Sequence, residues 1–355
     1  MNDAAYASVV APTRPVTDVD VAALGESMVT FLPGRPGRLA DVPSFHRAIG
    51  GAESNVACAL AAFGHTARWV SRVGADGFGD HLVERIAGYG VDVTAVHRDP
   101  GRPTGVYFRT AGDRGTGAHE VAYYRAGSAA SAMSVRNVDL AAARAARVLH
   151  LSGITAALSA ECRELLYALT APGPGRPLVS FDVNHRPGLW RDGEGAEVLL
   201  ELARRADLVF VGEDEADHAW GITGGPAAVR RLLPEPRVLV VKEGARGATA
   251  FTRERPDGTF QPALDTAVVA TTGAGDAFAA GFLSATLRGL TDRARLKYGH
   301  LFAAAALTTP GDLAAPPARD HADRLAALDD GAWERLRLGP GWTRAEQAEE
   351  EANIP

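Results

Sequence analysis

Runs of almost continuous apolar residues alternate along the chain with segments in which apolar residues recur at helical spacing. Such runs are typical of strands that are covered by helices on both faces. We predict central strands at residues 19–24, 69–73, 148–151, 178–182, 208–211 and 238–242. An alternation of strands and helices indicates a doubly wound α/β domain with a mostly parallel sheet.

Helical spacing is clear in two of the segments between these strands. One apolar face is formed by Val56, Ala59, Leu60 and Phe63, and another by Leu82, Val83 and Ile86. Gly64 and Gly90 follow the two patterns, at positions where helices commonly end.

Two regions, at about residues 27–50 and 103–127, interrupt this alternation. They contain short strands of alternating character and Gly-rich turns, and no helix follows them. We expect a small antiparallel β lid there, as part of one domain at residues 18–339. Because bare strand edges invite pairing, the lid is also a candidate dimer surface. Residues 1–17 and 340–355 are expected to be tails, the second of them acidic.

The composition excludes several classes of protein. The formal net charge of −6 gives no general attraction to nucleic acid or to an anionic membrane. No stretch reaches the roughly 20 apolar residues of a membrane span. No secretory signal is visible, so we expect a cytoplasmic protein. Cys58 and Cys162 form no metal or redox motif, and Cys58 is expected to be buried.

The segment TTGAGDAFAAGF, at residues 271–282, carries the strongest chemical signal. The small residues Gly273, Ala274 and Gly275 allow close approach to the backbone, and a helix that starts here directs free N–H groups outward. This predicts an anion hole. Asp276 would repel an anion, so it suits a base that accepts a proton from a hydroxyl attacking a phosphoryl group. The alternative is an Asp N-cap on a buried helix.

Three segments carry a family resemblance: GGAESNVACALAAFG, RVGADGFGDHLVERIAGYGVDV and TTGAGDAFAAGF. They resemble the two signatures of the ribokinase-like (PfkB) carbohydrate kinases, in the same order and at a similar separation. The resemblance covers about residues 19–324. It implies a three-layer α/β/α domain with a small β lid, and a reaction that uses ATP and Mg2+. It places the catalytic base on Asp276 and the anion hole on residues 273–275.

The nucleotide side of the site follows from the same resemblance. VVKEGARGA resembles the nucleotide loop of the family, in which Gly244 and Gly247 would let the backbone lie against ATP. Lys242 would stand near phosphate, although a solvated lysine at a strand end is an equal alternative. Asn184 is expected on the ATP side as well. The resemblance implies that Mg2+ is held through phosphates and water, near Glu215.

The segment SFDVNHRPGLW continues beyond a predicted strand, and such loops hold ligands in α/β sheets. Asp182, Asn184 and Arg186 form one polar cluster there. Arg186 is suited to a bidentate contact with a carboxylate, which a neutral sugar does not need. The alternative is a surface ion pair.

The segment VAYYRAGSAAS gives a second indication of an acidic substrate. Tyr123 and Arg125 lie on one face of a strand, and Tyr107 can join them from a neighbouring strand. With GGAESNVA, HLSGIT and DVNHRPGLW, this set resembles the 2-keto-3-deoxygluconate kinases of the family. That implies transfer to the C6 hydroxyl of the sugar acid. It also implies a set of substrate-binding residues: Gly51, Tyr107, Tyr123, Arg125 and Arg186, with Asn55 nearby. Cross-strand packing is the alternative for the tyrosines.

Three departures from the family pattern leave other functions open. Ala270 and Gly212 stand where many members have Asp and Asn, and YGHLFAAAAL lacks the Asn beside adenine. The alternatives are a kinase of a neutral sugar such as fructose or ribose, and a sugar- or nucleotide-binding regulator without turnover. The resemblance also implies a homodimer through the lid, with higher assemblies left open.

Overall fold

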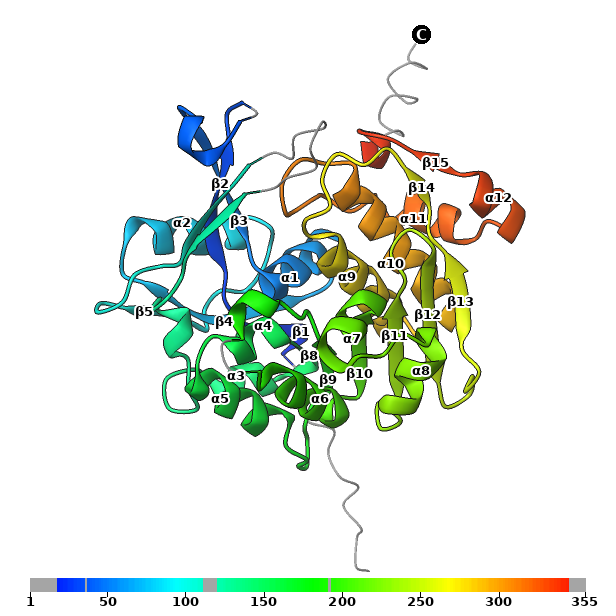
Figure 1. The fold of residues 1–355 in the computed structure, drawn as a ribbon, viewed down its shortest axis with the longest axis horizontal. Coiled ribbons are helices and arrows are strands. Elements are labelled where there is room, and N and C mark those ends of the chain that lie inside the picture. The colour runs from blue at the N-terminus through cyan, green and yellow to red at the C-terminus, as the bar shows by residue number, and fades with distance from the viewer. Residues whose placement is uncertain (1–17, 36, 111–119, 191–192, 345–355) are drawn as a thin grey trace, which may run out of the picture.

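The structure is a computed structural model of the chain, and it describes residues 18–35, 37–110, 120–190 and 193–344 (Figure 1). The tail predicted at residues 1–17 and residues 345–355 of the second predicted tail lie outside these ranges. No helix of the described residues is both long and apolar enough to cross a membrane.

A nine-stranded sheet forms the centre of the molecule. Its order is β13 (Thr259–Pro262), β12 (Gly247–Thr252), β11 (Val238–Lys242), β10 (Leu208–Gly212), β9 (Leu178–Asp182), β8 (Ala146–Ser152), β1 (Val19–Leu24), β4 (Ala67–Gly74) and β5 (Val96–Asp99). The pairs β11–β12 and β12–β13 are antiparallel, and the other pairs are parallel. The mostly parallel sheet and the six predicted central strands are confirmed. The edge strands β5 and β13, and β12 beside β13, were not predicted.

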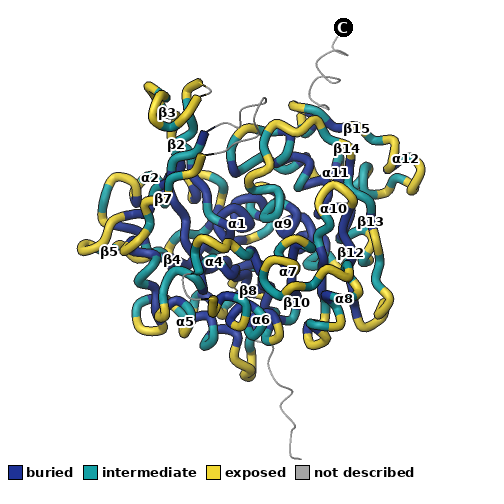
Figure 2. Tube along the Cα trace, viewed as in Figure 1, coloured by how far each residue is buried: buried dark blue, intermediate teal, exposed yellow. Residues whose placement is uncertain are grey.

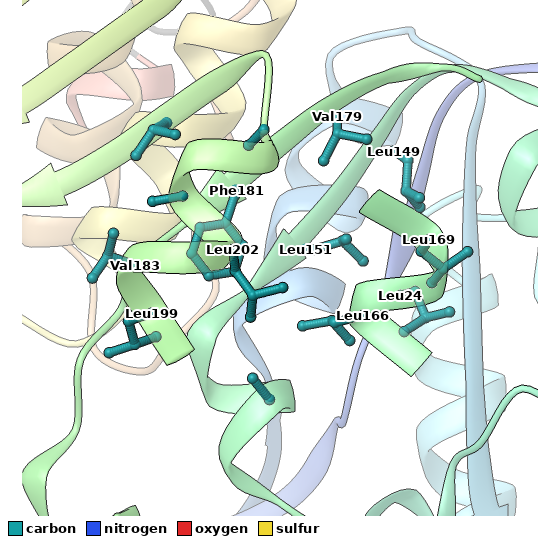
Figure 3. Close-up of a cluster of buried hydrophobic side chains, with 14 of the residues drawn as sticks. Leu24, Leu149, Leu151, Leu166, Leu169, Val179, Phe181, Val183, Leu199 and Leu202 are labelled. Carbon is teal, nitrogen blue, oxygen red and sulfur yellow. The ribbon is translucent and has the colours of Figure 1, made fainter. Parts of the chain in front are cut away.

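Helices cover both faces of this sheet. On one face, Leu208 and Phe210 of β10 belong to a core with α1 (Ala52–Ala62), α9 (Ala274–Leu287), α10 (Asp292–Leu307) and α11 (Arg319–Ala326). On the other face, Val209 and Val211 belong to a core with α5 (Ala160–Thr170), α6 (Gly195–Arg205), α7 (Glu213–Trp220) and α8 (Gly225–Leu232). Figure 3 shows this second core, and Figure 2 shows that its strands are buried. Burial of both faces explains the continuous apolar runs of the sequence.

The remaining short elements complete the chain. The helices are α2 (Gly77–Ala87), α3 (Leu140–Arg144), α4 (Gly153–Ala157) and α12 (Asp330–Arg335), and the strands are β14 (Asp265–Thr266) and β15 (Arg337–Leu338). Short 3-10 turns lie at Leu39–Asp41, Ala130–Ala132, Pro187–Leu189 and Trp342–Arg344. Trp342 is only 8% exposed and packs in the core with Leu338, so the folded part continues beyond the predicted boundary at residue 339.

The predicted helical faces are confirmed. Leu60 of α1 and Leu82 and Ile86 of α2 are fully buried. Gly64 and Gly90, just beyond the ends of the two helices, have φ of 89° and 88°, a conformation that glycine adopts without strain. The thiols of Cys58 and Cys162 are free and buried, and burial raises their pKa to about 12 and about 11. They are therefore unreactive core side chains at neutral pH.

A second, four-stranded sheet lies beside the main domain, and we call it the small sheet. Its order is β3 (Phe45–Gly50), β2 (Met28–Pro33), β6 (Val106–Arg109) and β7 (Val121–Tyr124). The predicted lid sheet is thus confirmed. It consists of two antiparallel pairs that are joined by one parallel pairing, between β2 and β6. Tyr123 and Tyr124 of β7 are 54% and 65% exposed, and a dimer through this sheet stays a prediction.

Candidate active site

A cavity of about 880 Å3 is lined by residues of the small sheet and by the carboxyl edge of the main sheet. Glu26 follows β1, and Asp182, Gly212 and Lys242 are the last residues of β9, β10 and β11. Parallel strands end at one edge, which is why residues distant in sequence meet there. The volume is within the usual range for a small-molecule site. Every predicted site residue lines this cavity except Ala274 and Gly247.

The start of α9 forms one wall of the cavity. Gly273 is the N-cap of α9, with φ of 79°, and a Cβ at this position would lie 2.1 Å from the carbonyl oxygen of Asp312. Only glycine fits this place. The first-turn N–H groups, among them those of Gly275 and Asp276, have no acceptor within the helix, and the helix dipole adds positive potential. The geometry suits the predicted anion hole. Gly273 rather than Asp276 is the N-cap, so the N-cap alternative for Asp276 is wrong.

Asp276 lies half-buried in the first turn of α9. Its Oδ2 accepts a hydrogen bond of 2.8 Å from Nδ2 of Asn55 in α1. Burial raises the pKa of Asp276 to about 7, and the charge of Asp182 adds to this effect, whereas Asn55, Lys242 and Arg186 oppose it. A carboxyl group with this pKa exchanges a proton readily at neutral pH.

Lys242 and Asp182 form a largely buried ion pair beneath the cavity. Nζ of Lys242 lies 3.2 Å from both carboxylate oxygens of Asp182. Burial lowers the pKa of Lys242, but the charge of Asp182 outweighs it, and the net pKa is above the usual value. Lys242 is therefore charged at neutral pH, and the alternative of a solvated strand-end lysine does not hold.

We expect Lys242→Met to lower the free energy of unfolding by about 3 kcal/mol, because it leaves the buried charge of Asp182 without a partner. Urea unfolding followed by circular dichroism at pH 7 measures this. The double variant Lys242→Met/Asp182→Asn should regain most of the loss. A single variant as stable as the wild type would show that the pair contributes nothing.

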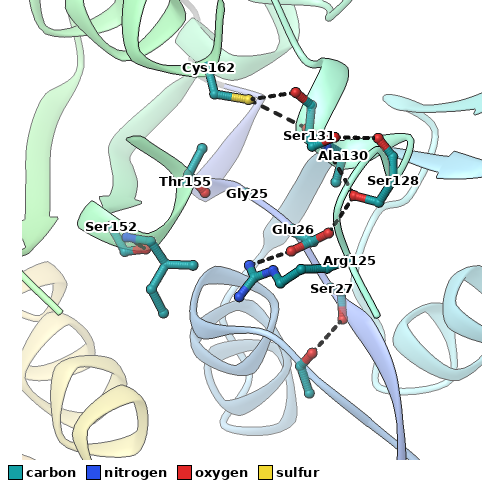
Figure 4. A network of polar contacts seen from close by, with 12 residues as sticks. Gly25, Glu26, Ser27, Arg125, Ser128, Ala130, Ser131, Ser152, Thr155 and Cys162 are labelled. Atoms are coloured by element: carbon teal, nitrogen blue, oxygen red, sulfur yellow. Dashed lines mark hydrogen bonds and ion pairs between the residues drawn. The ribbon is translucent and has the colours of Figure 1, made fainter. Parts of the chain in front are cut away.

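A buried ion pair between Glu26 and Arg125 lies at the side of the cavity where the small sheet begins (Figure 4). Glu26 is 3% exposed, and its Oε1 accepts a hydrogen bond of 2.8 Å from Ser128. The guanidinium carbon of Arg125 lies 5.8 Å from the ring centroid of Tyr123. The sequence predicted Arg125 and Tyr123 here but missed Glu26. An acid shortly after a mostly apolar strand, in ALGES, was the available signal.

A third polar group joins the small sheet to the main domain. The hydroxyl of Tyr107 donates to Oδ2 of Asp312, and Nη2 of Arg109 lies 3.0 Å from Oδ1 of Asp312. Nη1 of Arg109 also donates to the hydroxyl of Thr272, at 2.8 Å. Burial raises the pKa of Asp312, and Arg109 and Tyr107 oppose this. Arg109 and Asp312 were not predicted. The lone acid of the Gly/Pro-rich segment TTPGDLAAP was the available signal for Asp312.

Tyr107, Tyr123 and Gly51 have different surroundings. Tyr107 and Tyr123 are cross-strand neighbours with ring centroids 5.4 Å apart, so the predicted packing alternative describes a real contact. Tyr107 is 5% exposed and Tyr123 is 54% exposed, and both line the cavity. Gly51 lies close to the chain after β1, where an added Cβ would be 2.3 Å from the carbonyl oxygen of Glu26.

The loop after β9 brings Arg186 and Asn184 to the cavity. Nη1 of Arg186 lies 3.4 Å from Oε1 of Glu215, and the Arg186 side chain is 54% exposed. This is the surface ion pair that the sequence left as the alternative. Asn184 is buried with φ of 40°, and its Oδ1 has no partner among the described residues. Oε2 of Glu215 accepts from the N–H of Gly212 at 2.7 Å, which fixes the start of α7.

The two glycines of the predicted nucleotide loop differ in their surroundings: Gly244 lines the cavity and Gly247 lies in a strand. Gly244 has φ of 59°, lines the cavity, and has no atom within 4 Å of an added Cβ. Gly247 is the first residue of β12, and an added Cβ would lie 2.3 Å from the carbonyl oxygen of Gln261 in β13. Gly247 does not line the cavity, and its contact with ATP stays a prediction. The structure shows that Gly247 allows the close pairing of β12 with β13.

Acidic residues line the cavity without forming a metal centre of their own. Among the described residues, no group of three or more His, Cys, Asp or Glu side chains is arranged to hold an ion. Asp182, Asp214 and Glu215 all line the cavity. An added Cβ at Gly212 would lie 2.4 Å from Oδ1 of Asp214, so the Asp214 carboxylate occupies the space in which a side chain at residue 212 would begin.

Comparisons with known proteins show which sequences and folds this chain is similar to. A family model described as pfkB family carbohydrate kinase matches residues 19–319. A 2-dehydro-3-deoxygluconokinase of Bacillus subtilis is 34% identical over 306 residues, which are 85% of this chain and 94% of that protein. The crystal structure of a 2-dehydro-3-deoxygluconokinase from Thermotoga maritima is 25% identical, with a TM-score of 0.75 over 87% of this chain and 100% of that chain. A fructokinase from Xylella fastidiosa, solved with bound ATP, is also 25% identical, with a TM-score of 0.75 over 86% of this chain and 97% of that chain.

Proposed function

Because the chain belongs to the pfkB family of carbohydrate kinases, we propose that it transfers the γ-phosphoryl group of ATP to the C6 hydroxyl of 2-keto-3-deoxygluconate, also called 2-dehydro-3-deoxygluconate. The observation that carries this proposal is Asp276, a half-buried carboxyl group with a pKa of about 7 at the free amide end of α9. The arginines on the same cavity support the choice of an acidic substrate.

Asp276 is the base of the proposed reaction. Its Oδ2 is occupied by the hydrogen bond from Asn55, so Oδ1 is the oxygen that takes the proton of the C6 hydroxyl. A pKa close to the working pH makes the carboxylate available and still basic enough to accept this proton. Its position in the first turn of α9 places it next to the N–H groups that we expect to bind phosphate oxygens.

The residues on the nucleotide side fit ATP and Mg2+. Bound Mg2+ neutralises negative charge on the phosphates of ATP. The amide end of α9 and the charged Lys242 offer donors to the phosphates, and the open backbone at Gly244 leaves room for the nucleotide. Asp214 and Glu215 suit contacts to metal-bound water. Because Asp214 fills the space beside Gly212, we expect it to supply the polar contact that an Asn at residue 212 makes in other members.

The acid end of the substrate is assigned to Arg125 and Arg186. Nε of Arg125 is buried and has no partner within the described ranges, so its guanidinium has donor capacity beyond the ion pair with Glu26. A guanidinium carries five N–H donors, enough to serve Glu26 and a substrate carboxylate together. Tyr107 and Asp312 offer contacts for sugar hydroxyls at the same wall.

A substrate screen tests this proposal. Release of ADP is measured in a coupled assay with Mg2+ and ATP, with 2-keto-3-deoxygluconate, fructose or ribose as acceptor. We expect kcat/KM for the keto acid to exceed that for fructose by at least about 100-fold, the effect of one or two charged hydrogen bonds. Calorimetric binding of sugar and nucleotide without any turnover would support the regulator and overturn the proposal.

A kinase of a neutral sugar is the second candidate. It is favoured by the pairing of all three arginines of the cavity with acids: Arg109 with Asp312, Arg125 with Glu26, and Arg186 with Glu215. In such pairs the acid already neutralises the positive charge of the arginine, which would otherwise attract a substrate carboxylate. A preference for fructose or ribose in the screen would establish this candidate instead.

We expect Asn55→Ala to move the acidic limb of the pH–rate profile to higher pH by about one unit. The variant removes the donor that favours the ionised form of Asp276, and one pKa unit corresponds to about 1.4 kcal/mol. The rate at pH 6 should therefore fall about tenfold, whereas the rate at pH 9 should change little. An unmoved limb would show that Asp276 is not the group that titrates.

A further inference from the structure

A second cavity, of about 560 Å3, lies next to the cavity that Asp276 lines, which we call the reaction cavity. Its walls are the edge strand β3 of the small sheet, helix α2 with Tyr89 just beyond it, and the loop at residues 310–313. Asp312 borders both cavities, so the loop that carries it is the partition between them. Nothing in the proposed reaction uses this second space.

The polar lining of the second cavity is basic. Arg47 of β3 and Arg85 of α2 face it, together with His81 and Tyr89. Neither Arg47 nor Arg85 has a carboxylate partner among the described residues, in contrast with the arginines of the reaction cavity. His81 and Arg85 are four residues apart, and Tyr89 follows four residues later, so one side of this segment faces the cavity.

His81 lines the same cavity as Arg47 and Arg85. Burial lowers the pKa of His81, and the charges of Arg47 and Arg85 lower it further, whereas Glu84 opposes them. Its Nε2 is buried and has no hydrogen-bond partner in the described part of the chain. Among the residues that the structure describes, Asp312 is the only acid on the wall, and Arg109 compensates its charge. A bound anion would therefore meet two uncompensated guanidinium groups.

We propose that the second cavity binds a small phosphate monoester. Guanidinium groups match the geometry of phosphate oxygens, and two of them from facing elements suit a dianion better than a singly charged acid. Leu32, Ile49 and Leu313 form an apolar wall for the carbon part of the ligand. This site follows from its own lining residues and does not depend on which sugar the protein phosphorylates.

The position of the site links it to the reaction cavity. Strand β3 runs from Arg47 at the second cavity to Gly50 at the first, and residues 310–313 run alongside. Asp312 accepts a hydrogen bond from Tyr107 and forms an ion pair with Arg109, and both of these residues line the reaction cavity. A ligand that shifts this loop would change the affinity for the sugar, and we infer that the site is regulatory.

Binding is tested by nuclear magnetic resonance of the histidine-labelled full chain. Glycerol 3-phosphate is titrated with Mg2+ and a saturating non-hydrolysable ATP analogue, which keeps the probe away from the amide end of α9. We expect saturable shifts of the His81 ring signals, and at least tenfold weaker binding by Arg47→Gln/Arg85→Gln. Arg253→Gln, at an exposed arginine elsewhere, is the matched control. Absence of saturation, or equal binding by the double variant, overturns the site.

Two further measurements test which ligand the second cavity prefers and whether its binding changes the affinity for the sugar. Citrate and glycerol should shift the His81 signals much less than glycerol 3-phosphate, and an equal response to citrate would overturn the preference for phosphate. In kinetic assays we expect the probe to change the KM for the sugar at least threefold in the wild type and not in the double variant, with basal turnover the same in both. Binding without any change in KM would retain the site and overturn its regulatory role.

Discussion

Asp276→Asn should lower kcat by about 1,000-fold and leave the affinities for sugar and nucleotide within a few-fold of the wild type. General-base catalysis contributes about 100- to 10,000-fold. Asn has nearly the same shape as Asp and remains next to Asn55, so the cavity keeps its form. Steady-state kinetics for turnover and calorimetry for binding provide the measurement. Turnover close to that of the wild type would remove Asp276 from its assigned role.

The pH profile separates a lost base from a damaged fold. In the wild type, log kcat/KM should rise with unit slope below pH 7 and level off above it, because only the ionised carboxylate of Asp276 accepts a proton. The residual activity of Asp276→Asn should lack this limb. A variant that retains the limb would assign the titration to another group.

The same substitution should stabilise the fold at pH 8. The pKa of Asp276 is higher in the folded chain than in the unfolded chain, so folding favours the protonated form. The contribution of protonated Asp276 to the free energy of unfolding is fully present below about pH 4 and is lost as the pH rises toward 7. A neutral Asn at pH 8 avoids the cost of a half-buried charge. Thermal unfolding should show a Tm increase of about 2 °C at pH 8 and none at pH 4.

Arg125→Ala should have the second large effect, a fall in kcat/KM for the keto acid of about 100- to 1,000-fold. Loss of a charged hydrogen bond to the substrate carboxylate accounts for this magnitude. The variant also leaves the buried carboxylate of Glu26 without its counter-charge, which should destabilise the fold by about 3 kcal/mol. Kinetics and urea unfolding must therefore be measured on the same protein.

The double variant Glu26→Gln/Arg125→Met separates these two effects. Without either buried charge, its stability should return to within about 1 kcal/mol of the wild type, while kcat/KM for the keto acid stays low. Any weak turnover of fructose should be unaffected. If the double variant regains activity toward the keto acid, Arg125 acts only through the fold, and the acid end of the substrate is bound elsewhere.

Much of the fold could be predicted because its signals are local. The six central strands are almost continuously apolar because helices cover both of their faces. The strands β12 and β13 lack such a signal: Phe260 of the edge strand β13 is 47% exposed, and β12 is rich in Ala, Gly and Thr. The parallel pairing of β2 with β6 joins two hairpins far apart along the chain, which no local pattern can indicate.

The sequence by itself determined that a glycine-rich turn opens a buried helix with an acid in its first turn, because each of these preferences acts over a few neighbouring residues. Only the tertiary structure decided what surrounds that acid. Asn55 and Asp276 are 221 residues apart and share a hydrogen bond, and Glu26 and Asp312 are ordinary acids until Arg125 and Arg109 are brought against them. A pKa depends on burial and on charges within a few ångströms, and these are set by how distant parts of the chain meet.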